Sequence, residues 1–185
     1  LLTPSEGSIQ VCGDAPGVAS KAQVAYLPDS IYLNTWMTVQ QIVDYFAEFY
    51  ADFRKELAME MLLRLGVSPK QKLKTLSKGN KEKVCLILTM SRNARLYVLD
   101  EPIAGVDPAA REYILSTIVS NYNPGASIII TTHLITDIEQ VLDDFMFLSY
   151  GGKILCAGNA EITRNETGKS LDQLFKEVFI CSQNY

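Results

Sequence analysis

The predicted fold of this chain is decided by the stretch Leu96-Tyr97-Val98-Leu99-Asp100-Glu101-Pro102. Its continuous apolar run is typical of a strand that is buried on both faces of a parallel sheet. Charges are not left inside such a sheet, so we expect Asp100 and Glu101 at the carboxyl end of the strand, where open α/β sheets bind their ligands. Pro102 cannot donate a ladder hydrogen bond, and the strand is predicted to end there. A core strand capped by solvated acids explains this stretch equally well, so other motifs must decide.

The length and composition of the chain limit the classes of protein to which it can belong. The 185 residues suffice for one well-buried domain and are too few for two large ones. The net charge of -4 gives no reason to expect a nucleic-acid partner. The four cysteines lack C-x-x-C spacing and are interpreted as reduced thiols of a cytosolic protein. No apolar run approaches membrane-spanning length and no signal peptide is visible; the missing initiator Met is compatible with a fragment whose natural beginning is absent.

The part of the chain before residue 38 is predicted to form two short strands. Residues 8–12 alternate between polar and apolar side chains, as in a half-buried strand, and residues 14–20 form a loop of small residues. Residues 23–27 are the second predicted strand, which Pro28 and Asp29 stop.

A helical pattern occupies residues 38–94. Thr38 and Gln41 have the spacing of a capping box, and apolar residues then recur at helical intervals. Asp52 is predicted to cap a second helix and Ser77 a third. This block is too long for an ordinary crossover between strands, so we interpret it as an inserted helical subdomain.

The chain beyond the central strand returns to an alternation of helices and strands. Asp107-Pro108 has the pattern of an N-cap followed by proline at the first helical position. Residues 127–130 form another continuous apolar strand, and a helix is predicted over residues 135–142. Gly151-Gly152 indicates a hairpin, and a capping box at residues 170–173 opens a terminal helix.

The first candidate for chemistry besides the carboxylates is Ser77-Lys78-Gly79. A serine N-cap followed closely by glycine leaves backbone N–H groups at a helix N-terminus, which attracts phosphate through those donors and the helix dipole. Lys78 adds a positive charge. An ordinary capped helix in a lysine-rich surface stretch explains the same residues.

The second candidate is His133, which follows Thr131 and Thr132 and is the only histidine of the chain. An imidazole at the end of this strand would lie beside the carboxylates of the neighbouring strand. There it could hydrogen-bond a phosphate oxygen or a positioned water. A structural role is the alternative for a lone histidine.

In their order along the chain, these motifs resemble the ATP-binding subunit of ABC transporters. Leu76–Asn80 resembles the signature motif of that family, and Leu96–Glu101 its Walker B strand with the catalytic glutamate. Ala104–Asp107 resembles the D-loop and His133 the switch histidine, while Tyr26–Asp29 falls where the family has its Q-loop. Ordered motifs are far more specific than any one of them alone.

The resemblance implies an α/β, P-loop NTPase-like fold: a mainly parallel sheet core with an inserted helical subdomain. The expected ATPase core comprises residues 1–37 and 95–160 and is incomplete, since the strands and P-loop at its N-terminal side are absent. The helical subdomain with the signature motif comprises residues 38–94, and residues 161–185 form a C-terminal helical tail.

Several departures from the family pattern accompany the resemblance. The Walker A motif, G-x-x-x-x-G-K-[ST], is absent, and Gly168-Lys169-Ser170 lacks both the first glycine and a preceding strand. The P-loop is expected upstream of the chain. Asp29 stands where most members have glutamine, and Lys78 and Asn80 stand where glycine and glutamine are usual. These variations are similar to the branch that contains bacterial drug and lantibiotic exporters.

The resemblance also implies a role for each motif in binding ATP. Two subunits face each other head to tail, and the P-loop of one holds ATP with its Mg²⁺. Ser77, Lys78 and Gly79 of the other subunit would contact the γ-phosphate. Asp107 would pass information across the dimer.

The hydrolytic roles fall on the carboxylates and the histidine. Asp100 would help to hold Mg²⁺, through water, as Walker B aspartates do. Glu101 would orient and polarise the attacking water, and His133 would contact the γ-phosphate. Asp29 would reach Mg²⁺ or the water. Catalysis of this kind is mostly positioning and charge stabilisation.

The implied function is that of an ATP-hydrolysing subunit that powers export, peripheral on the inner face of the membrane through a transmembrane permease subunit. The helical block and the apolar loop of residues 29–37 would bear the docking groove, although burial against the protein's own helices explains the loop as well. A soluble, non-transport relative and a nucleotide-incompetent interaction fragment are the alternative functions. Without a P-loop, the chain alone is expected to be inactive.

Overall fold

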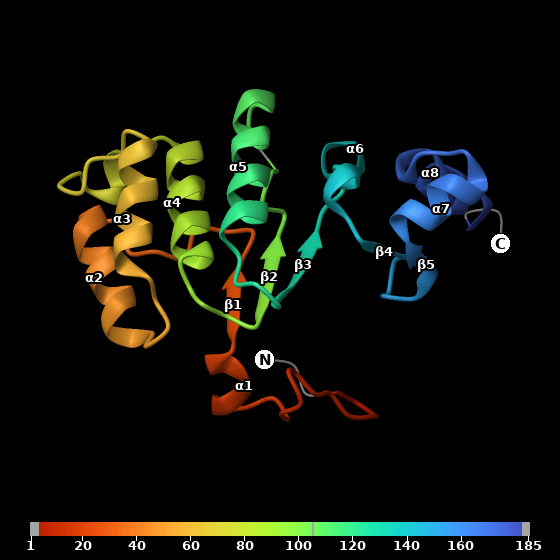
Figure 1. Cartoon of the computed structure of the whole chain (residues 1–185), viewed down its shortest axis with the longest axis horizontal. Coiled ribbons are helices and arrows are strands. Elements are labelled where there is room, and N and C mark those ends of the chain that lie inside the picture. Colours follow the sequence, from red (N-terminus) through yellow and green to blue (C-terminus); the bar gives the residue numbers. More distant parts are fainter. Residues whose placement is uncertain (1–3, 105, 183–185) are drawn as a thin grey trace. The chain divides into compact units, whose positions relative to one another are not determined.

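The computed structural model describes residues 4–104 and 106–182 (Figure 1). These residues form two compact units, one up to Thr132 and one from His133 onward. Each unit is described by itself. The division into an ATPase core, a helical subdomain and a tail stays a prediction.

The first unit is built on a three-stranded parallel sheet. Its strands are β1 (Val24–Leu27), β2 (Leu96–Asp100) and β3 (Ser127–Thr131), in the order β1-β2-β3. The central position of β2 confirms the fold predicted from its apolar run. Leu27 pairs with Leu99, and Asp100 pairs with Thr131. The segments that follow all three strands therefore emerge at one edge of the sheet.

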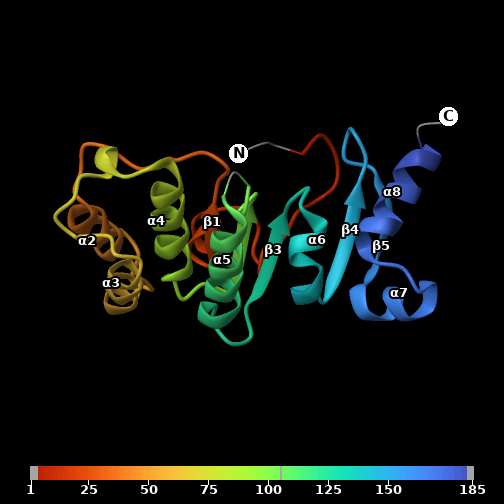
Figure 2. The ribbon, with the colours of Figure 1, turned by 90° about the horizontal axis from the view of Figure 1, so that it is seen from above.

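The connection from β1 to β2 consists of helices and the loops between them over residues 38–94. It contains α2 (Val39–Phe49), α3 (Lys55–Arg64), the short 3₁₀ helix η1 (Leu73–Thr75) and α4 (Lys78–Met90). These elements share a buried apolar cluster of their own, and Figures 1 and 2 show α2, α3 and α4 gathered on the β1 side of the sheet. The predicted capping box of α2 is present, because Thr38 accepts a hydrogen bond from the backbone N–H of Gln41.

The helix α5 (Pro108–Asn121) makes the second parallel crossover, from β2 to β3. It begins at the proline that the sequence pattern predicted.

The two faces of the sheet differ in exposure. On one face of β2, Tyr97 and Leu99 are fully buried. On the other face, Tyr26, Val98 and Ile129 stand side by side in register, and Tyr26 and Ile129 are 50% and 51% exposed. In the described part of the chain, the helices therefore cover one face of the sheet far better than the other.

The second unit contains a hairpin with helices around it. Its elements are α6 (Ile135–Ile138), η2 (Glu139–Val141), β4 (Asp144–Leu148), β5 (Ile154–Asn159), α7 (Ala160–Thr167) and α8 (Leu171–Ser182). β4 and β5 are antiparallel, and the predicted turn residues Gly151 and Gly152 both have positive φ. The predicted capping box before α8 is also present: Gln173 donates its backbone N–H to Ser170, and its side chain accepts from the backbone of Ser170.

Three local predictions were wrong. Residues 8–12 form no strand; the segment makes only the bridge between Val11 and Asp14, and α1 (Val18–Ala22) replaces the predicted loop. A tight turn, with φ of 54° at Cys12 and 90° at Gly13, pairs Val11 with Asp14 instead. Instead of one helix over residues 135–142, α6 and η2 divide the segment.

The third error is Asp52, which was predicted to cap a helix. α3 begins at Lys55 with Arg54 as its N-cap. The carboxylate of Asp52 instead accepts a hydrogen bond from Nε of Arg92. Asp52 therefore forms a long-range ion pair with Arg92 and does not cap α3.

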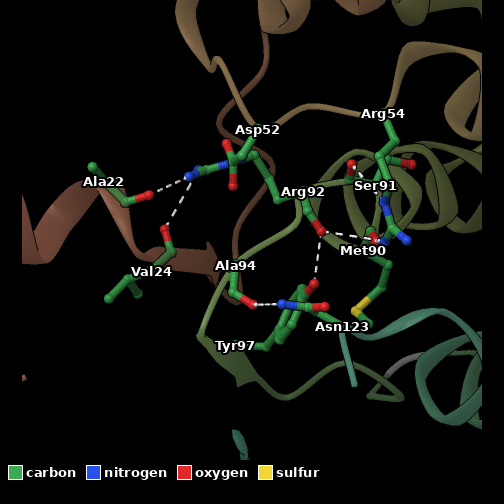
Figure 3. A network of polar contacts seen from close by, with 10 residues as sticks. All are labelled: Ala22, Val24, Asp52, Arg54, Met90, Ser91, Arg92, Ala94, Tyr97 and Asn123. Atoms are coloured by element: carbon green, nitrogen blue, oxygen red, sulfur yellow. Dashed lines mark hydrogen bonds and ion pairs between the residues drawn. The ribbon is translucent and has the colours of Figure 1, made fainter. Parts of the chain in front are cut away.

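Two arginines join the helical connection to the rest of the first unit (Figure 3). Arg92 is only 4% exposed and donates to the carbonyls of Ala22 at 2.9 Å and Val24 at 3.4 Å. Its guanidinium carbon also lies 3.9 Å from the centre of the Tyr50 ring.

Arg54 connects the carboxyl-terminal ends of two helices. Its Nη2 donates to the carbonyls of Met90 at 2.7 Å, at the end of α4, and of Asn121 at 2.7 Å, at the end of α5. A cation beside the last carbonyls of a helix is favoured by the helix dipole. These contacts fix the end of α4 that lies farthest from Ser77.

Candidate functional site

Two adjacent carboxylates lie at the carboxyl end of the central strand, as predicted. Asp100 is the last residue of β2, and its Oδ1 accepts a hydrogen bond from the hydroxyl of Thr131 in β3 at 2.5 Å. Oε2 of Glu101 accepts a hydrogen bond from the hydroxyl of Thr132 at 3.1 Å. Both acids are partly buried. The end of β3 therefore supplies one hydroxyl donor to each carboxylate.

The backbone of Glu101 is held in an uncommon conformation. Its φ is +47°, in the left-handed region that non-glycine residues seldom adopt. The N–H of Glu101 donates to the carbonyl of Thr131 at 2.9 Å, and the N–H of Ala104 donates back to the carbonyl of Glu101 at 3.2 Å. The strand therefore ends in a turn that begins at Glu101, one residue earlier than Pro102. Backbone strain of this kind costs about 1–3 kcal/mol and is concentrated at functional sites.

A pocket of about 410 Å³ opens beside these carboxylates. Three segments line it: the residues after β1, including Asp29; the residues at the end of β2, including Asp100 and Glu101; and one side of the first turns of α4, including Lys78. Parallel pairing explains the meeting of the first two segments, because Leu27 is level with Leu99 and Asp29 follows β1 as Glu101 follows β2. The structure thus brings together four of the residues singled out in the sequence.

The start of α4 has the geometry that the sequence predicted. Ser77 is the N-cap, and its Oγ accepts a hydrogen bond from the backbone N–H of Asn80 at 3.3 Å. Ser77 and Lys78 are exposed. A Cβ atom at Gly79 would meet nothing within 4 Å, so the fold of this chain does not require glycine there. The glycine keeps the helix start accessible to an approaching group.

Sequence reasoning missed two residues of the pocket wall, Glu82 and Cys85. Glu82 lies one turn beyond Lys78, with their charged groups 3.8 Å apart. Burial, and secondarily the Glu82 carboxylate, raises the pKa of the Cys85 thiol to about 12. The thiol is therefore protonated at neutral pH. The helical spacing of residues 78, 82 and 85 was the available signal, but only the position of β1 shows which face of α4 lines the pocket.

Asp107 and His133 lie outside the pocket lining. Asp107 is exposed at the start of α5, where its carbonyl accepts the N–H of Arg111 at 3.1 Å. Gly105, in the middle of the predicted D-loop, lies outside the described residues. His133 is exposed and is the first residue of the second unit. The roles of Asp107 and His133 stay predictions.

The carboxylates fit a Mg²⁺ ion that is shared with a phosphate ligand. Among residues 4–104 and 106–182, no group of three or more His, Cys, Asp or Glu side chains could hold a metal ion. Mg²⁺ does not need such a group, because it is usually bound by one or two carboxylates together with water and substrate phosphates. Asp29 and Asp100, which line the same pocket, supply that number of carboxylates.

None of the helices in the described ranges is both long enough and apolar enough to span a bilayer.

Comparison with known proteins places these observations in a family. The family model described as ABC transporter matches residues 1–104. The chain is 30% identical over 157 residues to an uncharacterized ABC transporter ATP-binding protein of Synechocystis sp., covering 80% of this chain and 44% of that protein. It is 26% identical over 183 residues to the Nod factor export ATP-binding protein I of Ralstonia nicotianae, covering 95% and 57%. The chain thus spans about half the length of these curated relatives.

The fold is also similar to a solved structure described as an ATP binding subunit of an ABC transporter. The two superpose with a TM-score of 0.82 at 26% sequence identity, covering 95% of this chain and 78% of the other.

Proposed function

Because this chain belongs to the ABC transporter family, we propose that it forms part of an ATP-hydrolysing subunit that powers transport across a membrane. The observation that carries the proposal is the pocket at the carboxyl edge of the sheet. It brings the carboxylates of Asp29, Asp100 and Glu101 together in one pocket. Carboxylates that can hold a cation and orient a water are among the groups that hydrolysis of a phosphoanhydride needs.

In this proposal the carboxylates divide the work. Asp100 would help to hold Mg²⁺, through water, and Asp29 would contact the ion or the attacking water. The ion would neutralise charge on the phosphates of ATP. Glu101 orients the water and accepts its proton as the water attacks the γ-phosphorus, while the bond from that phosphorus to the β–γ bridging oxygen breaks and ADP leaves. The hydroxyls of Thr131 and Thr132 each donate a hydrogen bond to one oxygen of the two acids.

The phosphate contacts come from the α4 start of a second subunit. Ser77, Lys78 and the backbone of Gly79 would bind the γ-phosphate of an ATP molecule held by the P-loop of the first subunit. His133 would contact the same phosphate, and Asp107 would connect the two sites across the dimer. A side chain at Gly79 would have room in this fold, so packing within the chain does not explain the glycine. The absence of a side chain there supports the approach of a nucleotide bound by the partner subunit.

A transmembrane permease subunit is the other proposed partner. Trp36 is 65% exposed and Tyr32 is 46% exposed, in the loop before the helical connection. Aromatic side chains of this size are frequent at the centres of protein interfaces. Docking through this loop would keep the protein peripheral on the inner face of the membrane. Export is the proposed direction, supported by the name of the Ralstonia relative and by the variations at Asp29 and Lys78.

The test is an ATPase assay on this chain extended at its N-terminus with the strand, P-loop and helix of a relative's Walker A segment, hereafter the extended chain. We expect Mg²⁺-dependent hydrolysis that Glu101→Gln slows by about 10²- to 10⁴-fold. Tight ATP binding without hydrolysis would contradict the proposed activity, and the absence of both binding and hydrolysis would favour a nucleotide-incompetent interaction fragment. Co-purification with a hydrophobic multi-span partner would separate a transporter subunit from a soluble relative.

A further inference from the structure

Each carboxylate of the site accepts a hydrogen bond from a threonine at the end of β3. One of these threonines, Thr132, was given no role in the sequence analysis. Thr131 is the last residue of β3 and donates to Asp100, whereas Thr132 lies just beyond the strand and donates to Oε2 of Glu101. The pairing of Asp100 with Thr131 sets both contacts, because it places the next residue of each strand side by side.

We propose that Thr132 is the positioning residue of the catalytic carboxylate: its hydroxyl fixes the orientation of the Glu101 side chain toward the attacking water. The inference rests on the proposed function of Glu101 as the group that activates water. Thr132 itself touches neither water nor phosphate in this scheme, and it acts only through the carboxylate.

The geometry shows why a positioning group is needed at this point. The backbone of Glu101 is fixed by its hydrogen bond to the carbonyl of Thr131 and by its left-handed φ of +47°. The carboxylate, however, stands at the end of a side chain with three rotatable bonds, and a displacement of about 1 Å can cost on the order of 100-fold in rate. An ionised carboxylate is only an acceptor, so a hydroxyl donor is suited to hold one of its oxygens. The same strand end thus fixes both the backbone and the carboxylate of Glu101.

A first experiment measures this contact in the chain as it stands, without nucleotide. Urea unfolding of Thr132→Val, Glu101→Ala and the double variant forms a double-mutant cycle. Valine has the shape of threonine but cannot donate. We expect a coupling of about tenfold in the unfolding equilibrium constant, as is usual for a hydrogen bond to a charged group. Strictly additive effects would overturn the proposal, because the two side chains would then not interact.

A second experiment measures the consequence for catalysis in the extended chain. Thr132→Val should lower kcat by about 10- to 100-fold while KM for ATP changes less than about twofold. Thr132→Ser, which keeps the hydroxyl, should restore most of kcat. In the Glu101→Gln background, Thr132→Val should cause no further loss. A merely structural threonine would not give this split between kcat and KM or this rescue by serine.

The matched control is Thr89→Val, which also removes a hydroxyl, one that donates to the carbonyl of Cys85 within α4 at 3.0 Å. Its kcat and KM should equal those of the parent. If Glu101→Gln lowers kcat but Thr132→Val does not, the positioning role is wrong and the proposed function stands. If Glu101→Gln hydrolyses ATP at the parental rate, the catalytic assignment of Glu101 is wrong and the positioning role of Thr132 fails with it. If the parental extended chain hydrolyses no ATP, the proposed function itself is wrong.

Discussion

Asp52 and Arg92, which are 40 residues apart in the sequence, form an ion pair where the helical connection meets the sheet. The Arg92 side chain is 4% exposed, and that of Asp52 is 26% exposed. The same guanidinium binds the carbonyls of Ala22 and Val24, directly before and at the start of β1 (Figure 3). The pair therefore ties the loop between α2 and α3 to the beginning of the sheet.

Asp52→Ala should destabilise the chain by about 3 kcal/mol, because it leaves a buried guanidinium without its counter-charge. Urea unfolding measures the change. Asp44 provides the control: its ion pair with Lys55 lies at the surface, so Asp44→Ala should cost no more than about 0.5 kcal/mol. If the two substitutions lower the free energy of unfolding equally, the burial of Arg92 does not strengthen its ion pair with Asp52.

The chain by itself should not bind ATP tightly. It has no Walker A motif, whose backbone donors and lysine provide most phosphate contacts in proteins of this kind. Calorimetric titration of the 185-residue chain with Mg-ATP tests this. A micromolar dissociation constant would refute the prediction.

Glu101→Gln in the extended chain should reduce turnover by about 10²- to 10⁴-fold and leave ATP binding intact, because glutamine keeps the size of glutamate but not its basicity. In the proposed dimer, hydrolysis would allow the two subunits to separate, so the variant should accumulate as an ATP-held dimer. Size-exclusion chromatography with and without ATP detects that species. Unchanged turnover would make Asp29 the next candidate for the catalytic carboxylate.

Ser77→Arg should prevent the ATP-held dimer from forming. A bulky cation at the N-cap would displace the γ-phosphate contact at the start of α4. Introduced together with Glu101→Gln, it should keep the extended chain monomeric on the same column. The control is Ser120→Arg, which places an arginine on the exposed surface of α5 and should leave the dimer intact.

Cys85 should resist modification in the folded chain. Its pKa of about 12 lies far above neutral pH, so only about one molecule in 10⁴ carries the reactive thiolate at pH 8. A thiol reagent and mass spectrometry should show Cys85 unlabelled in buffer and labelled in urea. Cys12, which is only partly buried, serves as the internal comparison. Equal labelling rates under native conditions would show that α4 opens readily.

The parts of the fold that sequence reasoning predicted are those with local causes. The apolar run before Asp100 is sufficient to make β2 a buried strand. The caps at Thr38 and Ser77 are set by residues three positions away. The meeting of Asp29 with the carboxylates at the end of β2 was expected only from the family resemblance, and the parallel register of β1 against β2 produces it.

The errors and omissions have long-range causes. Aspartate is a common N-cap residue, so the local sequence at Asp52 favours a cap. Its actual partner, Arg92, lies 40 residues away and could not be identified from local sequence. Residues 8–12 alternate like a strand, but in the described part of the chain they make only the bridge between Val11 and Asp14. Thr132 was visible as part of Thr131-Thr132-His133, yet only the register of β3 against β2 shows which threonine meets which acid.

At Glu101, the left-handed backbone means that selection for stability and selection for the proposed hydrolysis would favour different residues. Glycine adopts a φ of +47° without penalty, so Glu101→Gly would relieve the strain of the turn. A laboratory screen that selects for thermal stability alone would therefore enrich Glu101→Gly, which lacks the proposed catalytic carboxylate. Retention of glutamate at this position during directed evolution would show that hydrolysis, and not robustness, is under selection.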